Sequence, residues 1–175
     1  MNIYKHLILV SLSLLWTGLL AQTGAMDFNG DGKKETYTII EPPQNEEALD
    51  CFGECVCHIR FSDEKIPDLL VKNCIGGVPD ILGDLDGNGT IEIGIYPYWW
   101  TSCWSGYHVY TLAGDKWVDF IEPITIYPCD DNYESHKPLI ERVPQKKGFY
   151  KVKYYSMDDT DIQVKTKNVE PIFKK

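Results

Sequence analysis

A short acidic pattern occurs twice in this 175-residue chain and constrains its fold more than any other feature. Residues Asp27–Glu35 (loop 1) and Asp84–Glu92 (loop 2) both fit D-x-[DN]-x-[DN]-G-x-x-E, and they start 57 positions apart. Each places oxygen-bearing side chains at positions 1, 3, 5 and 9 and a glycine at position 6. Asp, Asn and Gly favour tight turns, so the pattern predicts two similar turns.

The residues that follow each turn favour a strand over a helix. Thr36–Ile40 is rich in β-branched residues, and Ile91, Ile93 and Ile95 alternate with other residues at a period of two. A helical EF-hand would place its bidentate glutamate at position 12, where this chain has Thr38 and Ile95. Each loop is therefore expected to lead into β-structure.

Oxygen atoms at this spacing suit calcium, a hard ion that takes six to eight oxygen ligands. Side chains at positions 1, 3 and 5, the carbonyl of position 7 and the acid at position 9 would surround one ion. The expected ligands are Asp27, Asn29, Asp31, the Lys33 carbonyl and Glu35 in loop 1, and Asp84, Asp86, Asn88, the Thr90 carbonyl and Glu92 in loop 2. An acidic turn without metal is the alternative, and the recurrence of every informative position argues against it.

The two loops differ in their flanking charge. Loop 1 contains Lys33 and Lys34, which repel a dication, whereas loop 2 has no basic residue. We therefore expect two calcium sites, of which the second binds more tightly.

Asp27–Glu35 and Gly83–Glu92, each followed by a predicted strand, resemble the calcium loops of FG-GAP/VCBS-type repeats, the kind found in integrin α-chain propellers. The resemblance implies that Glu35 and Glu92 are ligands, at a position where the family usually has Asp. Propellers of that family have six or seven blades, so two such units do not imply a closed propeller.

The N-terminus is typical of a secretory signal. Lys5 precedes the largely apolar stretch Leu7–Leu20, which is short for a membrane span. Cleavage is expected after Ala21, with Ala25 as a second option and an uncleaved anchor as the alternative. The mature chain is therefore expected to be exported, either periplasmic or extracellular, with no membrane span of its own.

The cysteine count agrees with export. Six cysteines follow the signal, and an even number in a secreted chain predicts disulfides. Fifteen pairings are possible for three bridges, and we expect Cys51–Cys55, Cys57–Cys74 and Cys103–Cys129. A zinc site at Cys55-Val-Cys57-His58 is the alternative, but no second pair of ligands follows at zinc-binding spacing.

The net charge of −9 restricts the possible partners. Binding to nucleic acid depends on basic patches, and adsorption to anionic lipid needs them too. Neither partner is expected. An acidic chain suits cations or a basic protein partner.

The sequence after the signal predicts a single all-β domain over residues 22–175. No stretch has a clear helical period, and short strand-like runs recur. The expected strands are Thr36–Ile40, Cys55–Phe61, Asp68–Val71, Ile91–Tyr98, Tyr107–Leu112, Trp117–Glu122, Phe149–Tyr155 and Ile162–Val169, with hairpin turns at Ala113–Lys116 and Met157–Asp161. This pattern predicts an antiparallel sandwich or open barrel, built from unit 1 (27–83), unit 2 (84–140) and a capping hairpin (141–175).

The second unusual feature of the sequence is the aromatic segment Tyr96–Tyr110, which contains seven aromatic residues. Pro97, Cys103 and Gly106 suggest that much of it is a loop. If exposed, Trp99, Trp100 and Trp104 would suit stacking on sugars or anchoring in a partner's pocket. The alternative is that these rings fill the core.

No motif for catalysis is present, since a G-x-S-x-G elbow is absent and His58, His108 and His136 are scattered in the sequence. The sequence therefore predicts a non-catalytic, calcium-binding module that recognises a protein or glycan of the cell envelope. The alternative is an inhibitor or immunity protein against a lysozyme-like or other envelope-degrading enzyme. A small, acidic, disulfide-braced β-domain resembles I-type periplasmic lysozyme inhibitors, and its charge would attract a basic enzyme.

Overall fold

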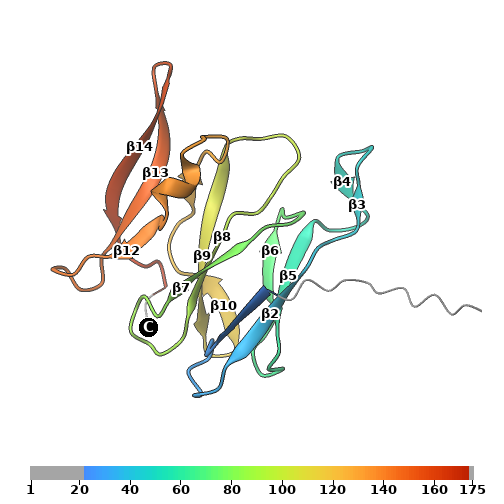
Figure 1. Cartoon of the computed structure of the whole chain (residues 1–175), viewed down its shortest axis with the longest axis vertical. Coiled ribbons are helices and arrows are strands. Elements are labelled where there is room, and N and C mark those ends of the chain that lie inside the picture. The colour runs from blue at the N-terminus through green and yellow to red at the C-terminus, as the bar shows by residue number, and fades with distance from the viewer. Residues whose placement is uncertain (1–21, 174–175) are drawn as a thin grey trace, which may run out of the picture.

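Residues 22–173 of the chain are described by a computed structural model, in which almost all regular structure is antiparallel β (Figure 1). This confirms the all-β prediction. Several sheets are present, and in the described residues none closes into a barrel. The predicted signal peptide falls on residues 1–21, which lie outside the described part.

The four-stranded N-terminal sheet and four strands of the five-stranded central sheet share one topology. The N-terminal sheet has the order β1 (Gln22–Met26), β2 (Glu35–Ile40), β5 (Val56–Phe61) and β6 (Leu69–Lys72). The central sheet has the order β7 (Pro79–Gly83), β8 (Glu92–Ile95), β9 (Ser105–Ala113) and β10 (Lys116–Asp119), and β11 (Ile124–Ile126) also pairs with β9. In both sheets the predicted loop connects the first strand to the second, so each loop bridges one hairpin.

The remaining strands form two smaller sheets. The C-terminal sheet contains β12 (Ile140–Arg142), β13 (Tyr150–Asp158) and β14 (Asp161–Val169). A short hairpin of β3 (Gln44–Asn45) and β4 (Asp50–Cys51) interrupts the N-terminal sheet between β2 and β5, and the 3₁₀ turn η1 (Tyr133–His136) precedes β12. Figure 1 shows the three larger sheets arranged side by side, with the central sheet between the other two.

The central sheet separates two hydrophobic cores because side chains alternate between its faces. On β8, Ile93 and Ile95 pack toward the N-terminal sheet, with Ile59 of β5. On β9, Tyr107 and Val109 lie on the opposite face and pack toward the C-terminal sheet. Full burial of each such aliphatic side chain stabilises the fold by about 2 kcal/mol.

The predicted strands and turns agree well with those observed. Each of the eight predicted runs overlaps a strand, and both hairpins close where expected, at the pairs Ala113–Lys116 and Asp158–Asp161. The run predicted to extend to Tyr98 ends at Ile95. Pro97 follows two residues later and has no N–H for a ladder. The short strands β1, β3, β4, β7, β11 and β12 were not predicted.

The three cysteine pairs have the expected connectivity, Cys51–Cys55, Cys57–Cys74 and Cys103–Cys129, with Cα atoms 5.4 Å apart in each. The second joins β5 to the end of β6, and the third ties the aromatic segment to the chain after β11. At sequence separations of 17 and 26 residues, these two bridges each stabilise the fold by about 3 kcal/mol on the loop-entropy estimate. No helix in residues 22–173 is long and apolar enough to cross a membrane.

Candidate metal centre

Loops 1 and 2 fold through the same set of backbone hydrogen bonds. The aspartate at position 1 accepts from the N–H groups of positions 4, 5 and 6, at 2.8, 3.0 and 2.8 Å in loop 1 and 2.6, 3.1 and 3.0 Å in loop 2. The side-chain oxygen at position 3 accepts from position 5, and that at position 5 accepts from position 7. The repeated sequence therefore has a repeated conformation, with its acidic side chains held by the turn.

Glycine is required at two positions of each loop. Gly30 and Gly32 have φ of 75° and 85°, and their counterparts Gly87 and Gly89 have 80° and 89°. Side chains other than glycine are hindered in this left-handed region. Sequence reasoning used only the glycine at position 6, although the one at position 4 is also present in both loops.

The glutamate at position 9 turns back to the start of its own loop. Glu35 Oε2 accepts a hydrogen bond from the Phe28 N–H at 3.0 Å, and Glu92 Oε2 accepts one from the Leu85 N–H. Both glutamates are buried, with exposed fractions of 3% and 0%. Each begins the strand that follows its loop, so the strand holds the last predicted ligand against the backbone of position 2.

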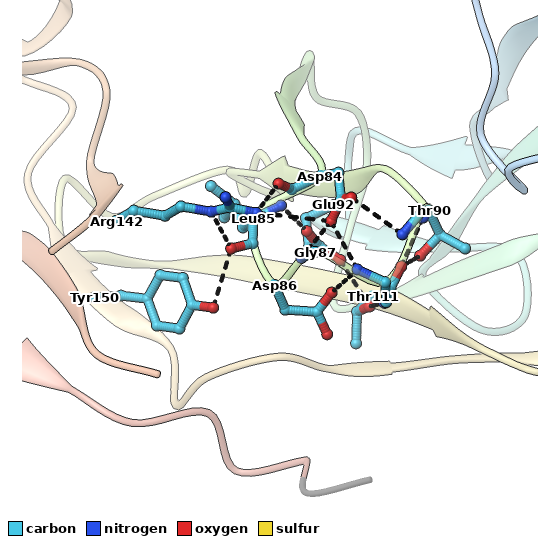
Figure 2. Close-up of polar contacts among 11 residues, drawn as sticks. Asp84, Leu85, Asp86, Gly87, Thr90, Glu92, Thr111, Arg142 and Tyr150 are labelled. Atoms are coloured by element: carbon cyan, nitrogen blue, oxygen red, sulfur yellow. Dashed lines mark hydrogen bonds and ion pairs between the residues drawn. The ribbon is translucent and has the colours of Figure 1, made fainter. Parts of the chain in front are cut away.

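The carboxylates converge in loop 2. Asp84, Asp86 and Glu92 each offer one oxygen, and the three oxygens lie within 4.8 Å of one another. Figure 2 shows this group together with Thr111 of β9, whose hydroxyl donates to Glu92 Oε1 at 2.8 Å. The pKa of Glu92 is raised to about 7, chiefly by burial. The hydrogen bonds from Thr111 and Leu85 oppose this rise, and the charges of Asp86 and Asp84 add to it.

The predicted ligands of loops 1 and 2 are buried to a similar degree, but those of loop 1 do not converge. In loop 2, Asp84 is exposed, and Asp86 and Asn88 are partly buried. In loop 1, Asp27 and Asn29 are partly buried, and Asp31 is exposed. Asp31 also forms an ion pair with Lys33 at 3.4 Å. Within residues 22–173, the loop 1 acids are not among the groups whose oxygens converge as closely as those of loop 2.

Two residues from the C-terminal sheet hold loop 2 and were not predicted from the sequence. Arg142 of β12 donates from Nε to the Leu85 carbonyl and from a terminal nitrogen to the Asp84 carbonyl. The Tyr150 hydroxyl also donates to the Leu85 carbonyl, at 3.1 Å (Figure 2). The Arg142 guanidinium lies 3.9 Å from Asp84 Oδ1, so loop 2 has a cation beside it that its own nine residues do not reveal.

The two loops lie in contact. The Ile91 N–H at the end of loop 2 donates to the Phe28 carbonyl of loop 1 at 3.3 Å. A Cβ atom on Gly30 would lie 2.5 Å from the Gly89 carbonyl oxygen. The loops therefore join the N-terminal and central sheets at one point.

The donor atoms fit a hard cation. Every predicted side-chain ligand offers a carboxylate or amide oxygen, and such oxygens suit calcium, whereas zinc and copper favour nitrogen and sulfur. A second group, Asp50 with Cys51 and Cys55, has both sulfurs joined in a disulfide. No cysteine in the described part is free, which leaves no thiolate for the alternative zinc site.

The tryptophans of the aromatic segment divide between surface and core. Trp99 is 39% exposed, while Trp100 and Trp104 are partly buried. Trp104 packs against the core next to Tyr127, with ring centroids 5.0 Å apart. A groove of about 510 Å³ runs beside them and is lined by Lys72, Asn73, Pro97, Trp99, Trp104 and His108, among others.

The three described histidines are separated in the fold. His58 lies in β5 beside Asp68, and His136 lies in η1 beside Asp130, at 3.5 and 3.6 Å. His108 lies in β9, where burial lowers its pKa. No two of them share an element.

Comparisons of the chain with protein-family models, with curated proteins and with solved structures find no match. The function of this protein is therefore inferred from the chemistry of its own residues.

Proposed function

We propose that this chain is an exported, non-catalytic binding module that holds one calcium ion in each of its two loops. The observation that carries the proposal is the convergence of Asp84, Asp86 and Glu92 on one point. Glu92 is fully buried and forms no ion pair with a basic side chain among the described residues. A buried carboxylate is costly unless a positive charge compensates it, and a dication held by loop 2 would do so.

Calcium would stabilise the fold at the junction of two sheets. Each loop joins the first two strands of its sheet, and the loops contact each other. At about 1 mM free calcium and a Kd of about 0.1 mM, each ion would add about 1.4 kcal/mol to the free energy of unfolding. The ion is therefore expected to brace the fold.

Calorimetric titration of metal-free, oxidised protein with calcium tests this proposal. Wild type should bind two ions, and the double variant Asp27→Ala/Asp84→Ala should bind none. Asp115→Ala is the matched control, because Asp115 is an exposed acid in the β9–β10 turn and outside both loops. Absence of bound calcium at millimolar free concentration would refute the proposal.

Export is supported by the signal-like N-terminus and the three cysteine pairs. Cleavage after Ala21 would leave Gln22, the first residue of β1, as the new N-terminus. Cleavage after Ala25 would remove most of β1, which pairs with β2. N-terminal sequencing of the exported protein should therefore start at Gln22.

The proposed partner of this module is a protein or glycan of the cell envelope. Trp99 is exposed and lines the groove together with Trp104, on a segment fixed by the Cys103–Cys129 pair. Trp100 packs edge to face against Trp99, with ring centroids 5.0 Å apart. Rigid aromatic side chains of this kind are typical anchors of binding surfaces. Calcium-dependent retention on cell-wall polysaccharide or envelope protein is the expected result.

An inhibitor of a basic envelope-degrading enzyme is the second candidate, and the charge distribution favours it. Residues 22–139 contain 21 acidic and 7 basic residues, a net charge of −14, whereas residues 140–173 contain 5 acidic and 7 basic residues, a net of +2. The acidic part would attract a basic lysozyme-like enzyme. Salt-sensitive inhibition of muramidase activity by the purified protein would select this candidate over the first.

A further inference from the structure

A cavity of about 510 Å³, called the basic cavity below, lies between loop 2 and the connection from β12 to β13. Loop 2 contributes Leu85, Asp86 and Gly87 to its lining, and the connection contributes most of residues 142–149. The volume falls in the range typical of small-molecule sites, so the cavity has room for more than a single ion. No residue lines both this cavity and the tryptophan groove, and the two are therefore separate.

The lining of the basic cavity carries an excess of positive charge. Its basic residues are Arg142, Lys146 and Lys147, and its one acid is Asp86. The excess is local, because the whole chain has a net charge of −9. At an ionic strength of about 0.15 M the Debye length is about 8 Å, so distant acids act on a bound group much less than these four side chains do.

Arg142 is fixed on the loop 2 side of the basic cavity (Figure 2). Its Nε donates to the Leu85 carbonyl, and one terminal nitrogen donates to the Asp84 carbonyl. A Cβ atom on Gly87 would lie 3.9 Å from that terminal nitrogen. A guanidinium has five N–H donors, and these two hydrogen bonds leave the others for a ligand. The side chain is 54% exposed, so a ligand can reach it from solvent.

The two lysines lie on the side of the connection, which is held by its own backbone. The Val143 N–H donates to the Phe149 carbonyl at 3.0 Å, and the Phe149 N–H donates to the Lys146 carbonyl at 3.1 Å. Lys146 Nζ lies 3.3 Å from the centroid of the Phe149 ring, which also lines the cavity. Neither Lys146 nor Lys147 forms an ion pair with an acid of residues 22–173. Their charges are therefore not neutralised by the chain.

This arrangement favours an oxyanion as the bound group. Carboxylates and phosphates accept charge-assisted hydrogen bonds from guanidinium and ammonium groups, and such bonds are stronger than those between neutral groups. A cation would meet three positive side chains and one carboxylate. The Asp86 carboxylate opposes an anion, but a calcium ion in loop 2 would offset its charge.

Apolar side chains lie among the charged ones. Pro144 and Phe149 belong to the lining, and Pro144 is exposed while Phe149 is partly buried. Apolar and aromatic walls beside a few fixed polar groups suit the C–H face of a sugar ring. A bare phosphate or carboxylate would leave these walls and much of the volume unused, so the oxyanion is expected to belong to a larger molecule.

We infer that the basic cavity binds an acidic sugar, whose carboxylate or phosphate group is held by Arg142, Lys146 and Lys147 while its ring packs against the apolar residues. This site rests on the glycan branch of the proposed function, and it specifies that the glycan is anionic. The contacts with the oxyanion come from the chain itself and do not require calcium.

Titration of the calcium-loaded protein with trigalacturonate and with glucose 6-phosphate, followed by NMR or calorimetry at about 0.15 M salt, tests this site. Trigalacturonate presents carboxylates and glucose 6-phosphate presents a phosphate ester, so the two sugars separate the two sources of the oxyanion. At least one should bind at millimolar concentration, and more tightly than its neutral counterpart, maltotriose or glucose. Blank titrations into the calcium buffer correct for the affinity of the sugars for calcium itself.

Lys146→Gln combined with Lys147→Gln should weaken this binding about tenfold, because two charge-assisted contacts are lost. Lys116→Gln combined with Lys167→Gln is the matched control. It changes the net charge equally, each pair has one lysine over an aromatic ring, and neither control residue lines the basic cavity. The control should bind the sugar as wild type does. Both double variants should unfold near the wild-type midpoint, since all four lysines are exposed.

Three results would overturn the site. One is the absence of binding for both acidic sugars, another is equal affinity for the acidic sugars and their neutral counterparts, and the third is equal affinity of the two double variants. The proposed function fails separately. If neither acidic sugar binds but the protein is still retained on cell-wall polysaccharide in calcium, the binding module stands without this site. If calcium does not bind but the two double variants still differ in sugar affinity, the site stands without calcium.

Discussion

Loops 1 and 2 have nearly the same sequence and the same internal hydrogen bonds, yet they lie in different surroundings. In loop 1, Asp31 is paired with Lys33, and the acids do not converge as closely as those of loop 2. Loop 2 is held from outside by Arg142 and Tyr150, and its Glu92 is fully buried against Thr111. The nine residues of the pattern thus set the turn, while the neighbouring sheets set how closely the carboxylates approach.

This difference changes the electrostatic argument for a tighter second site. Lys33 and Lys34 oppose a dication in loop 1, but Arg142 lies 3.9 Å from Asp84 and opposes one in loop 2. The remaining advantage of loop 2 is convergence, because Glu35 and Glu92 are both buried. Coulomb attraction grows as the separation falls, so three carboxylate oxygens close to one point should attract a dication more strongly than acids that lie further apart.

The largest effect is expected where the loops touch. Gly30→Ala should lower the free energy of unfolding by about 3 kcal/mol, because its Cβ would lie 2.5 Å from a backbone oxygen of loop 2 at a φ of 75°. Gly32→Ala is the matched control, with a φ of 85° and nothing within 4 Å, and should lower it by only about 1 kcal/mol. Urea unfolding in calcium measures both, and equal losses would mean that the loops do not touch.

Glu92→Gln should change stability in opposite directions with and without calcium. The folded pKa of about 7 lies above the usual value of 4.5, so ionisation of Glu92 destabilises metal-free wild type progressively as the pH rises between these values. At pH 8 without calcium the variant should therefore be more stable by about 2 kcal/mol, and at pH 4 the two should be similar. In millimolar calcium the order should reverse, because the variant lacks one ligand charge.

Thermal unfolding at both pH values, in chelator and in calcium, measures this reversal. The amide of Gln can still accept from the Leu85 N–H and donate to the Thr111 hydroxyl, so the variant is expected to fold. If Glu92→Gln were less stable than wild type in chelator at pH 8, Glu92 could not be a buried charge that destabilises the metal-free fold.

Single-site variants show directly which of the two loops binds calcium more tightly. Asp84→Ala should abolish the tighter of two calorimetric binding events, and Asp27→Ala the weaker. At about 1 mM calcium, loss of the tighter ion should lower the free energy of unfolding by about 1.4 kcal/mol. A greater loss of affinity or stability from Asp27→Ala would show that convergence in loop 2 does not decide the order.

The smallest effect concerns the exposed lysines of loop 1. Lys33→Gln combined with Lys34→Gln should strengthen calcium binding at loop 1 by at most about fivefold, because solvent and salt screen exposed charges. The gain should shrink as the salt concentration rises, which calorimetry at two ionic strengths would detect. Lys116→Gln, an exposed lysine at the start of β10, is the control and should leave calcium binding unchanged.

Local signals in the sequence predicted much of the fold and the recurrence of acids in the two loops. Ile93 and Ile95 alternate with residues of the other face, Gly114 allows the β9–β10 turn with a φ of 68°, and the acids of both loops recur at fixed spacing. Each of these signals is contained within a few residues. The pairing of Cys57 with Cys74 was also expected, and it joins neighbouring strands.

The contacts that distinguish the two loops could not be predicted in this way. Arg142 reaches loop 2 from 57 residues away along the chain, and Thr111 reaches Glu92 across 19 residues. Nothing around either residue indicates its partner. The same holds for Tyr133, whose buried hydroxyl has no hydrogen-bond partner among the described residues, a property that is evident only in the folded structure.

The sequence by itself determined the turn conformation of each loop, the strand that follows it and the oxygen atoms on offer, because backbone preferences and residue chemistry act over a few bonds. The tertiary structure decided which carboxylates converge, which of them are buried and which basic side chain lies beside them. Those properties depend on how the three sheets pack, since dielectric surroundings and charge separation are set by atoms that are distant in the chain and close in space.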